Sequence, residues 1–183
     1  MDALHIRNAD AIGEANAAAK ASDEPDIAVS AARTLAMAND FDSASALLAK
    51  NAGISGILGK QYPAAERFLA GLRAMSRRKG DSAIAALTDS YRLEPDPETA
   101  YYLAQAQMAE AQWTEAEATL DNLLKSKGAI LMDGVPSLIP LAEYKLAKCY
   151  ERLGNQAQAE SLRGVVRKLW DHADPELRNF LNM

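Results

Sequence analysis

The sequence predicts an all-α protein, an α-solenoid of stacked antiparallel helix pairs, and three observations support this prediction. Alanine is frequent while aromatic residues make up only 6% of the 183 residues, and alanine combines the highest helix propensity with close helix packing. Apolar residues recur at helical spacing, and no long stretch alternates apolar with polar residues. Breaks between helical patterns recur with the same neighbours, which indicates an internal repeat.

The first predicted elements lie between residues 1 and 53. Residues 1–24 contain one helical stretch, about 9–21, which we expect to be an N-terminal cap or half of a truncated repeat. Residues 25–53 contain two helical patterns separated by a break at Asn39-Asp40. The second pattern has a small residue, Ala44, just after its start. We interpret residues 25–53 as a degenerate helix–turn–helix repeat.

Two further repeats are predicted in the middle of the chain. Residues 64–95 break at Lys79-Gly80-Asp81, and Gly80-Asp81-Ser82-Ala83 looks two residues shorter than the turns of the other repeats. Residues 97–124 begin at Asp96-Pro97, in which aspartate is the expected N-cap and proline occupies the first helical position. The turn inside this repeat carries Trp113.

The last part of the chain departs from the regular spacing. Residues 125–139 replace the usual short linker, and we expect an inserted loop there. Residues 140–170 form the fourth predicted repeat. Asp174-Pro175 then opens a short helix over residues 174–183, whose simplest role is a C-terminal cap on the last repeat.

One small residue marks the second helix of every predicted pair. These residues are Ala44, Ala83, Ala116 and Ala159, and they are separated by 39, 33 and 43 positions. A helix–turn–helix unit with a period near 34 is typical of a tetratricopeptide array. Small residues are needed where two backbones cross closely, and the larger apolar residues then fill the space between repeats.

The chain resembles the tetratricopeptide repeat (TPR) family over about residues 25–170. In the copy at 97–124 the family pattern is matched by Leu103, Ala104, Trp113, Ala116 and Leu120. In the copy at 140–170 it is matched by Leu146, Ala147, Tyr150, Gly154 and Ala159. The other two copies are degenerate. The resemblance implies a right-handed superhelix whose first helices line a concave groove that binds a peptide or helix of a partner.

The resemblance also implies which residues line that groove. Carried over by position, they are Val29, Arg33, Met37, Ala74, Arg77, Arg78, Tyr101, Gln105, Met108, Tyr144, Lys148 and Glu151. Arg73 shares a helix face with Arg77 and joins the predicted partner-binding set. For Tyr101 and Tyr144, packing between repeats is an equally good interpretation. Val29 stands where a subset of the family has the first lysine of a clamp for chaperone C-termini, so we expect no such ligand.

Charge is unevenly distributed between neighbouring repeats. Residues 60–80 contain six basic residues and one acid, whereas residues 94–121 contain seven acids and no Lys or Arg. One interpretation is that a partner protein binds the basic repeat through an acidic segment. The opposite charges would then speed the encounter of the two proteins and fix the register in which they bind. The other is that these charges keep the surface solvated or that the repeats neutralise one another.

The sequence predicts no catalytic activity, no metal and no cofactor. His5 and His172 lie near the two ends, and a histidine in such a place is more often solvated than catalytic. Cys149 falls on a predicted helix, and a free cysteine there is commonly a small buried hydrophobe. The Gly53–Gly59 run has no preceding strand, and no phosphate-binding, zinc or calcium motif is present.

Protein–protein interaction is therefore the function class that we favour, as a scaffold or adaptor. Alternatives are a chaperone for a secreted or assembly client, a homo-oligomeric array joined through Ile130, Leu131, Met132 and Val135, and an RNA-binding repeat. The net charge of −5 disfavours nucleic acid, and no apolar run is long enough to span a membrane. We expect a cytoplasmic protein, or a periplasmic one if a leader has been removed.

Overall fold

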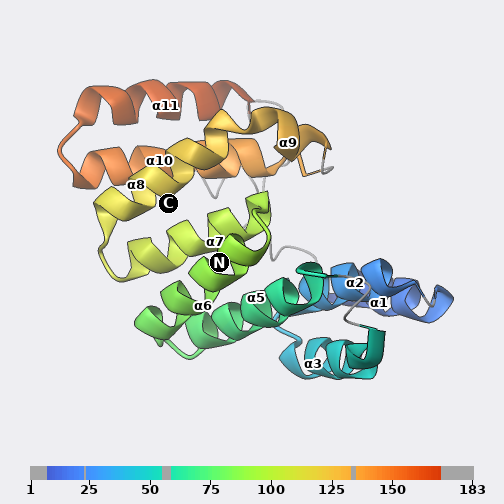
Figure 1. The fold of residues 1–183 in the computed structure, drawn as a ribbon. Coiled ribbons are helices and arrows are strands. Elements are labelled where there is room, and N and C mark those ends of the chain that lie inside the picture. The colour runs from blue at the N-terminus through green and yellow to red at the C-terminus, as the bar shows by residue number, and fades with distance from the viewer. Residues whose placement is uncertain (1–7, 23, 55–58, 133–134, 170–183) are drawn as a thin grey trace. The chain divides into compact units, whose positions relative to one another are not determined.

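The computed structural model is all-helical over the residues that it describes, which are 8–22, 24–54, 59–132 and 135–169. These residues form ten α-helices and one short 3-10 helix, no strand occurs among them, and the helices pack in neighbouring pairs (Figure 1). The predicted all-α, repeat-like fold is confirmed. The chain divides into two compact units, one up to Thr99 and one from Ala100.

The first unit is built on two helix pairs preceded by a single helix. Its elements are α1 (Asn8–Ala21), α2 (Pro25–Met37), α3 (Phe41–Lys50), the 3-10 helix η2 (Ala52–Ile54), α5 (Gln61–Ser76) and α6 (Gly80–Leu93). α2 packs against α1 and α3, and α5 packs against α6, α2 and α3. The first helices α2 and α5 are therefore central to this unit.

The second unit contains the next two helix pairs. Its elements are α7 (Pro97–Ala109), which begins just before the boundary, α8 (Trp113–Lys125), α9 (Lys127–Met132), α10 (Leu138–Arg152) and α11 (Gln156–Leu169). α10 packs against α11, α8 and the short α9. α10 is the central helix of this unit, because three of the other helices contact it.

All four helix pairs are closed by the same backbone turn. A residue with positive φ ends the first helix of each pair: Asn39 (65°), Arg78 (56°), Ala111 (57°) and Gly154 (85°). The next residue donates its N–H to the carbonyl five residues earlier, in Asp40–Leu35, Lys79–Ala74, Gln112–Gln107 and Asn155–Tyr150. This pair of features defines a Schellman C-cap, which satisfies carbonyls that the helix end leaves unpaired. The repeat is thus present in the backbone as well as in the side chains.

The shared turn corrects the alignment of the second predicted repeat. Its left-handed residue is Arg78, five residues before Ala83, and the same interval separates Asn39 from Ala44. The turn is therefore as long as the others. Of the predicted break, Lys79 is the N-cap of α6, and Gly80 and Asp81 belong to its first turn. The left-handed residue of this turn is an arginine, which adopts a positive φ less readily than glycine does.

The small residues of the second helices lie where the prediction requires them. Ala44, Ala83, Ala116 and Ala159 have no exposed surface. An even closer approach occurs at Gly71 on α5, where an added Cβ would lie 2.5 Å from Cγ of Leu87 on α6. Backbone proximity inside α5–α6 therefore depends on glycine as well as on Ala83.

The predicted inserted loop is partly helical, which corrects that part of the prediction. Residues 127–132 form α9, and Ile130 is fully buried in the second unit while Met132 is 89% exposed. Lys127 Nζ on α9 lies 2.9 Å from Oε1 of the buried Glu143 on α10. The insertion thus covers part of its own unit. The predicted cap at 174–183 lies outside the described residues, as do His5 and His172.

Candidate partner-binding groove

A groove of about 400 Å³ lies within the second unit, along the first helices of its two pairs. Its lining comes from the end of α7, the start of α8 and the outward face of α10: Gln105, Met108, Ala109, Trp113, Lys145, Lys148, Glu151 and Arg152. α7 and α10 are first helices, the kind that the family resemblance assigns to the binding face. The volume falls within the range of ligand-binding clefts.

Three cations form a stripe along one side of this groove. Lys145, Lys148 and Arg152 stand at positions i, i+3 and i+7 of α10, so they share one helix face. Lys145 and Lys148 are partly exposed and Arg152 is exposed. The acid that lines the groove, Glu151, lies 2.5 Å from Arg163 of α11. Its charge is therefore largely offset from outside the groove.

Aromatic rings and an amide orient these cations. Lys148 Nζ lies 4.6 Å from the centroid of the Tyr144 ring, and the Arg152 guanidinium lies 5.4 Å from that of Trp113. Lys145 Nζ donates to Oε1 of Gln105 on α7, at 3.4 Å. Cation–π contacts of this kind contribute about 0.5–1 kcal/mol at exposed sites. They hold the charged ends of Lys148 and Arg152 near the groove.

The structure brings several of the predicted site residues together and adds others. Gln105, Met108 and Lys148 all line the groove. Lys145 and Arg152 were not predicted, although their spacing from Lys148 on a helix was a readable signal. Trp113 was assigned only to the turn, because its approach to Arg152 joins residues on different helices.

The two tyrosines proposed as groove anchors are buried instead. Tyr101 has no exposed surface, and Tyr144 is 6% exposed. Val29, the position compared with the clamp lysine, is buried as well. Packing inside the fold is therefore the correct interpretation for these residues, because a side chain without exposed surface cannot contact a partner. Tyr144 still contributes indirectly through the contact of its ring with Lys148.

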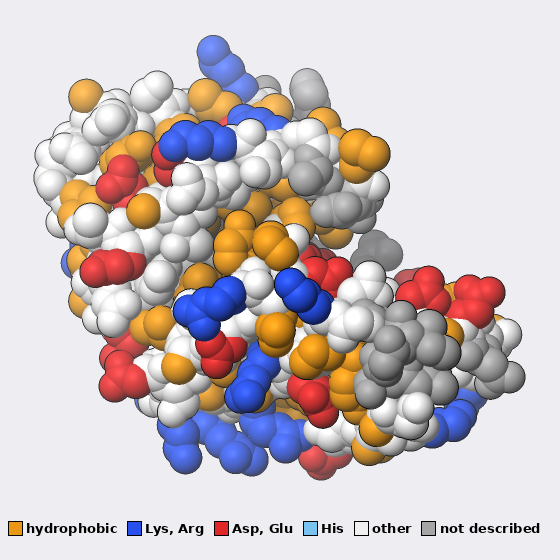
Figure 2. All heavy atoms as spheres, in the orientation of Figure 1, with side chains coloured by type: hydrophobic (Ala, Val, Ile, Leu, Met, Phe, Trp, Pro, Cys, Tyr) orange, Lys and Arg blue, Asp and Glu red, His pale blue; other side chains and the backbone are white. Residues whose placement is uncertain are grey.

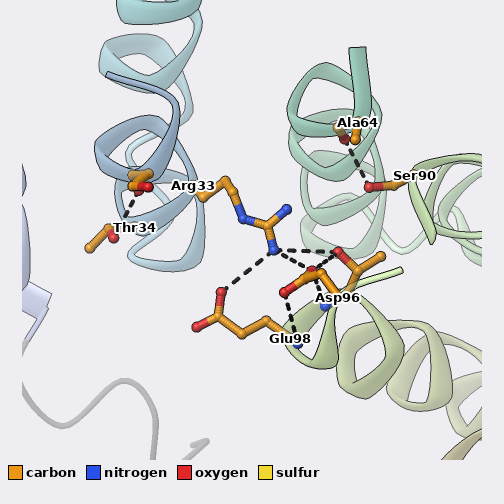
Figure 3. A network of polar contacts seen from close by, with 8 residues as sticks. Arg33, Thr34, Ala64, Ser90, Asp96 and Glu98 are labelled. Atoms are coloured by element: carbon orange, nitrogen blue, oxygen red, sulfur yellow. Dashed lines mark hydrogen bonds and ion pairs between the residues drawn. The ribbon is translucent and has the colours of Figure 1, made fainter. Parts of the chain in front are cut away.

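Arg33 forms ion pairs with two acidic residues of the first unit. Its guanidinium donates to Asp96 Oδ2 at 2.5 Å and lies 3.5 Å from Glu98 Oε2, as Figure 3 shows. It also lies 4.1 Å from the centroid of the Phe68 ring on α5. Asp96 meanwhile accepts from the backbone N–H of Thr99 and so caps α7. Arg33 therefore links α2 to the cap of α7.

Arg73 is likewise bound inside the first unit. It donates to the carbonyl of Phe41 at 2.9 Å and to Ser45 Oγ at 3.0 Å, both on α3. Arg77 and Arg78 are exposed in the turn after α5, and Figure 2 shows Lys and Arg side chains gathered over the α5–α6 region. Met37 is partly buried at the end of α2. The predicted site residues of this unit therefore form no single groove within it.

Cys149 is buried on α10, as the sequence predicted. Burial away from water raises the pKa of its thiol to about 11, because desolvation disfavours the thiolate. A thiol in this state is a poor nucleophile at neutral pH. Among the residues that the structure describes, no group of three or more His, Cys, Asp and Glu is placed to hold a metal ion. No helix in the same part of the chain is long and apolar enough to cross a membrane.

No family model, no curated protein and no solved structure matches the chain.

Proposed function

We propose that this protein is a non-catalytic scaffold or adaptor that binds a segment of a partner protein in the α7–α10 groove. The observation that carries the proposal is the convergence of Gln105, Met108 and Lys148 on one cleft. These residues were selected from sequence as lining of the first helices. Their meeting there is what a TPR-like arrangement would produce.

The lining of the groove suits a protein segment. Met108 and Ala109 provide an adaptable apolar wall, and methionine is common at surfaces that accept varied side chains. The cations of α10 provide polar contacts that fix orientation, and arginine is enriched where partners bind tightly. The four identical Schellman turns further support membership in the TPR family.

A matched pair of substitutions tests the groove. A peptide library would be selected for binding to the intact chain, and the affinity of a selected peptide measured for two variants. Ala109→Trp fills the groove with a large side chain, whereas Ala118→Trp makes the same change at an exposed position of α8 outside its lining. We expect Ala109→Trp to weaken binding at least about tenfold, since filling the cleft removes the room for the ligand. Equal affinity of both variants would show that the groove is not the binding site.

A homo-oligomeric array is the second candidate function. The observation that favours it is the pair of exposed apolar residues on α9, Leu131 at 58% and Met132 at 89% exposure. Light scattering at several concentrations, repeated with Leu131→Ser and Met132→Ser, tests it. Concentration-dependent association that both substitutions abolish would favour the array, and a monomer at all concentrations would exclude it.

A further inference from the structure

We infer that a second pocket of the second unit, lined by α8, α9, α10 and α11, binds the guanidinium of an arginine side chain from a partner protein. On binding, this guanidinium takes the place of the Lys127 ammonium and pairs with both carboxylate oxygens of Glu143. The pocket, called here the α8–α11 pocket, shares no lining residue with the α7–α10 groove. It is therefore a separate site that goes beyond the proposed function.

The α8–α11 pocket has a volume of about 410 Å³. It lies in the part of the second unit where α8, α9 and α11 pack against α10 (Figure 1). Leu124, Leu146 and Leu162 supply its apolar surface, and its charged lining includes Glu143 of α10 and Lys127 of α9. A concave, mostly apolar pocket with a few charged groups is the usual form of a ligand site.

The pocket and the groove lie on nearly opposite sides of α10. Glu143, Leu146 and Tyr150 of the pocket stand at positions i, i+3 and i+7 and share one helix face. The groove residues of α10 begin at Lys145, two positions later. Two residues turn an α-helix by about 200°. A ligand in the pocket therefore leaves the groove open.

Glu143 has a carboxylate of which only one oxygen is paired. The residue is 5% exposed, and Lys127 Nζ lies 2.9 Å from its Oε1. Oε2 is buried and has no hydrogen-bond partner among the residues that the structure describes. A buried oxygen without a donor is costly, and more so when it belongs to a charged group. A ligand that supplies the missing donor therefore gains affinity.

A guanidinium suits this carboxylate better than the ammonium that is already there. An ammonium is a point charge, and Lys127 pairs with one oxygen alone. A guanidinium is planar and presents parallel N–H groups that can pair with both oxygens of a carboxylate. The Lys127 side chain is half-exposed, so its ammonium can return to water. The terminal torsion of a glutamate is broad, which lets the carboxylate turn toward the incoming group.

The charges near Tyr150 favour a cation as the ligand. Burial is the main cause that raises the pKa of the Tyr150 phenol. The acids Glu117 and Asp121 raise this pKa further and outweigh Lys125, which lowers it. The pocket is therefore negative on balance at this part of its lining. A positive group is attracted to such a region, whereas an anion would be repelled there.

Peptides that differ in one side chain test the inference. The probe is Gly-Leu-Arg-Leu-Gly, blocked at both ends, and its counterparts carry lysine or citrulline, the neutral isostere of arginine. Amide chemical shifts of the intact, ¹⁵N-labelled chain give the affinities and locate the ligand. We expect the arginine peptide to bind at least about fivefold more tightly than either counterpart. The largest shifts should come from pocket residues such as Ser161.

Two substitutions at the ion pair should have opposite effects. Glu143→Gln removes the carboxylate and should lower the affinity of the arginine peptide to that of the citrulline peptide. Lys127→Ala removes the cation that the ligand must displace, so it should strengthen binding of the arginine peptide about threefold or more. Lys168→Ala is the matched control, because it removes an exposed positive charge of α11 outside the pocket lining. It should strengthen binding less. Circular dichroism confirms that each variant is folded.

A smaller probe distinguishes a partner's arginine from a free guanidinium compound. N-acetylarginine amide lacks the two leucines of the peptide and cannot make their contacts with the apolar part of the pocket. It should therefore bind more weakly than the arginine peptide. Equal affinity of the two would show that the site takes a free small molecule, and the inferred partner would be wrong.

Other outcomes overturn the inference without touching the proposed function. Equal binding of the arginine and citrulline peptides, or an arginine preference that survives Glu143→Gln, shows that the carboxylate does not bind the ligand. A lysine peptide that binds as tightly as the arginine peptide excludes pairing with both oxygens. Affinity that Lys127→Ala does not raise above the control excludes the exchange. If Ala109→Trp weakens the arginine peptide, that peptide binds in the groove and not in the pocket.

Discussion

Substitution of Gly71 by alanine is expected to destabilise the first unit, and the structure supplies the reason. Gly71 lies on the buried face of α5, where an added Cβ would come 2.5 Å from Cγ and 2.8 Å from Cδ2 of Leu87. Leu87 has no exposed surface, so its side chain has little room to withdraw. The new methyl group must therefore push α5 and α6 apart or force Leu87 out of its rotamer.

Two opposing free energies set the size of the effect. Replacing glycine by alanine inside a helix stabilises by about 1 kcal/mol, whereas overpacking a core costs about 1–3 kcal/mol. We expect a net loss of about 1 kcal/mol in wild type. Leu87→Ala by itself should cost about 2–5 kcal/mol. In that background the obstructing atoms are gone, so Gly71→Ala should instead stabilise by about 1 kcal/mol.

Urea unfolding followed by far-ultraviolet circular dichroism measures these changes. Tryptophan fluorescence would miss them, because Trp113 and Trp170 both lie in the sequence after the first unit. With a urea dependence of about 1–3 kcal/mol/M, a change of 1 kcal/mol moves the midpoint by roughly 0.3–1 M. Gly13→Ala on α1 is the matched control, since nothing lies within 4 Å of its added Cβ. It should stabilise in both backgrounds.

The sign change is the decisive result. If Gly71→Ala has the same sign of effect in wild type and in Leu87→Ala, the close approach of α5 to α6 at this point does not limit packing. If Gly71→Ala stabilises wild type as much as Gly13→Ala does, the geometry of the pair is wrong.

Three further changes test other contacts. Arg33→Lys should destabilise the first unit by about 1–2 kcal/mol, because a lysine cannot reproduce the planar contacts with Asp96 and the Phe68 ring; a midpoint equal to wild type in urea would refute this. Ser90→Ala should cost about 1–2 kcal/mol, since Ser90 Oγ donates to a backbone carbonyl of α5 at 2.8 Å in a buried place, whereas Ser76→Ala at an exposed position should cost less. Burial raises the pKa of the Cys149 thiol to about 11 from 9.0. The stability that the buried neutral thiol contributes is therefore fully present below pH 9, and it is lost as the pH rises toward 11 because the unfolded chain loses this proton first. Urea midpoints at several pH values should show this loss in wild type and less of it in Cys149→Ala.

Much of the fold was predictable because local rules repeat along the chain. Small residues at Ala44, Ala83, Ala116 and Ala159 identified the second helices, since only small side chains allow close backbone crossing. Proline at Pro97 marked the start of α7 correctly. The turn at Arg78 was misaligned because glycine is the usual left-handed residue and a glycine lies two positions later. α9 was missed because a six-residue helix carries too little periodicity to be distinguished from an apolar loop.

The candidate site was only partly predictable, for a different reason. Position within a repeat identified Gln105, Met108 and Lys148, because a helical repeat fixes which faces of its first helices point the same way. The position of a residue within a repeat does not show whether its polar or aromatic side chain already contacts other residues of the chain. Arg33 and Arg73 looked available in sequence, but their partners come from other helices of the same unit.

The sequence by itself determined the helices, their pairing and the small residues at their crossings, because these depend on periodicity and on neighbours close along the chain. Only the tertiary structure decided which charges remain open to a partner. Contacts such as Arg33–Asp96 and Arg152–Trp113 join residues far apart in sequence. Which of these contacts form depends on how neighbouring helices pack. A local sequence pattern does not show which residues from different helices come close in space.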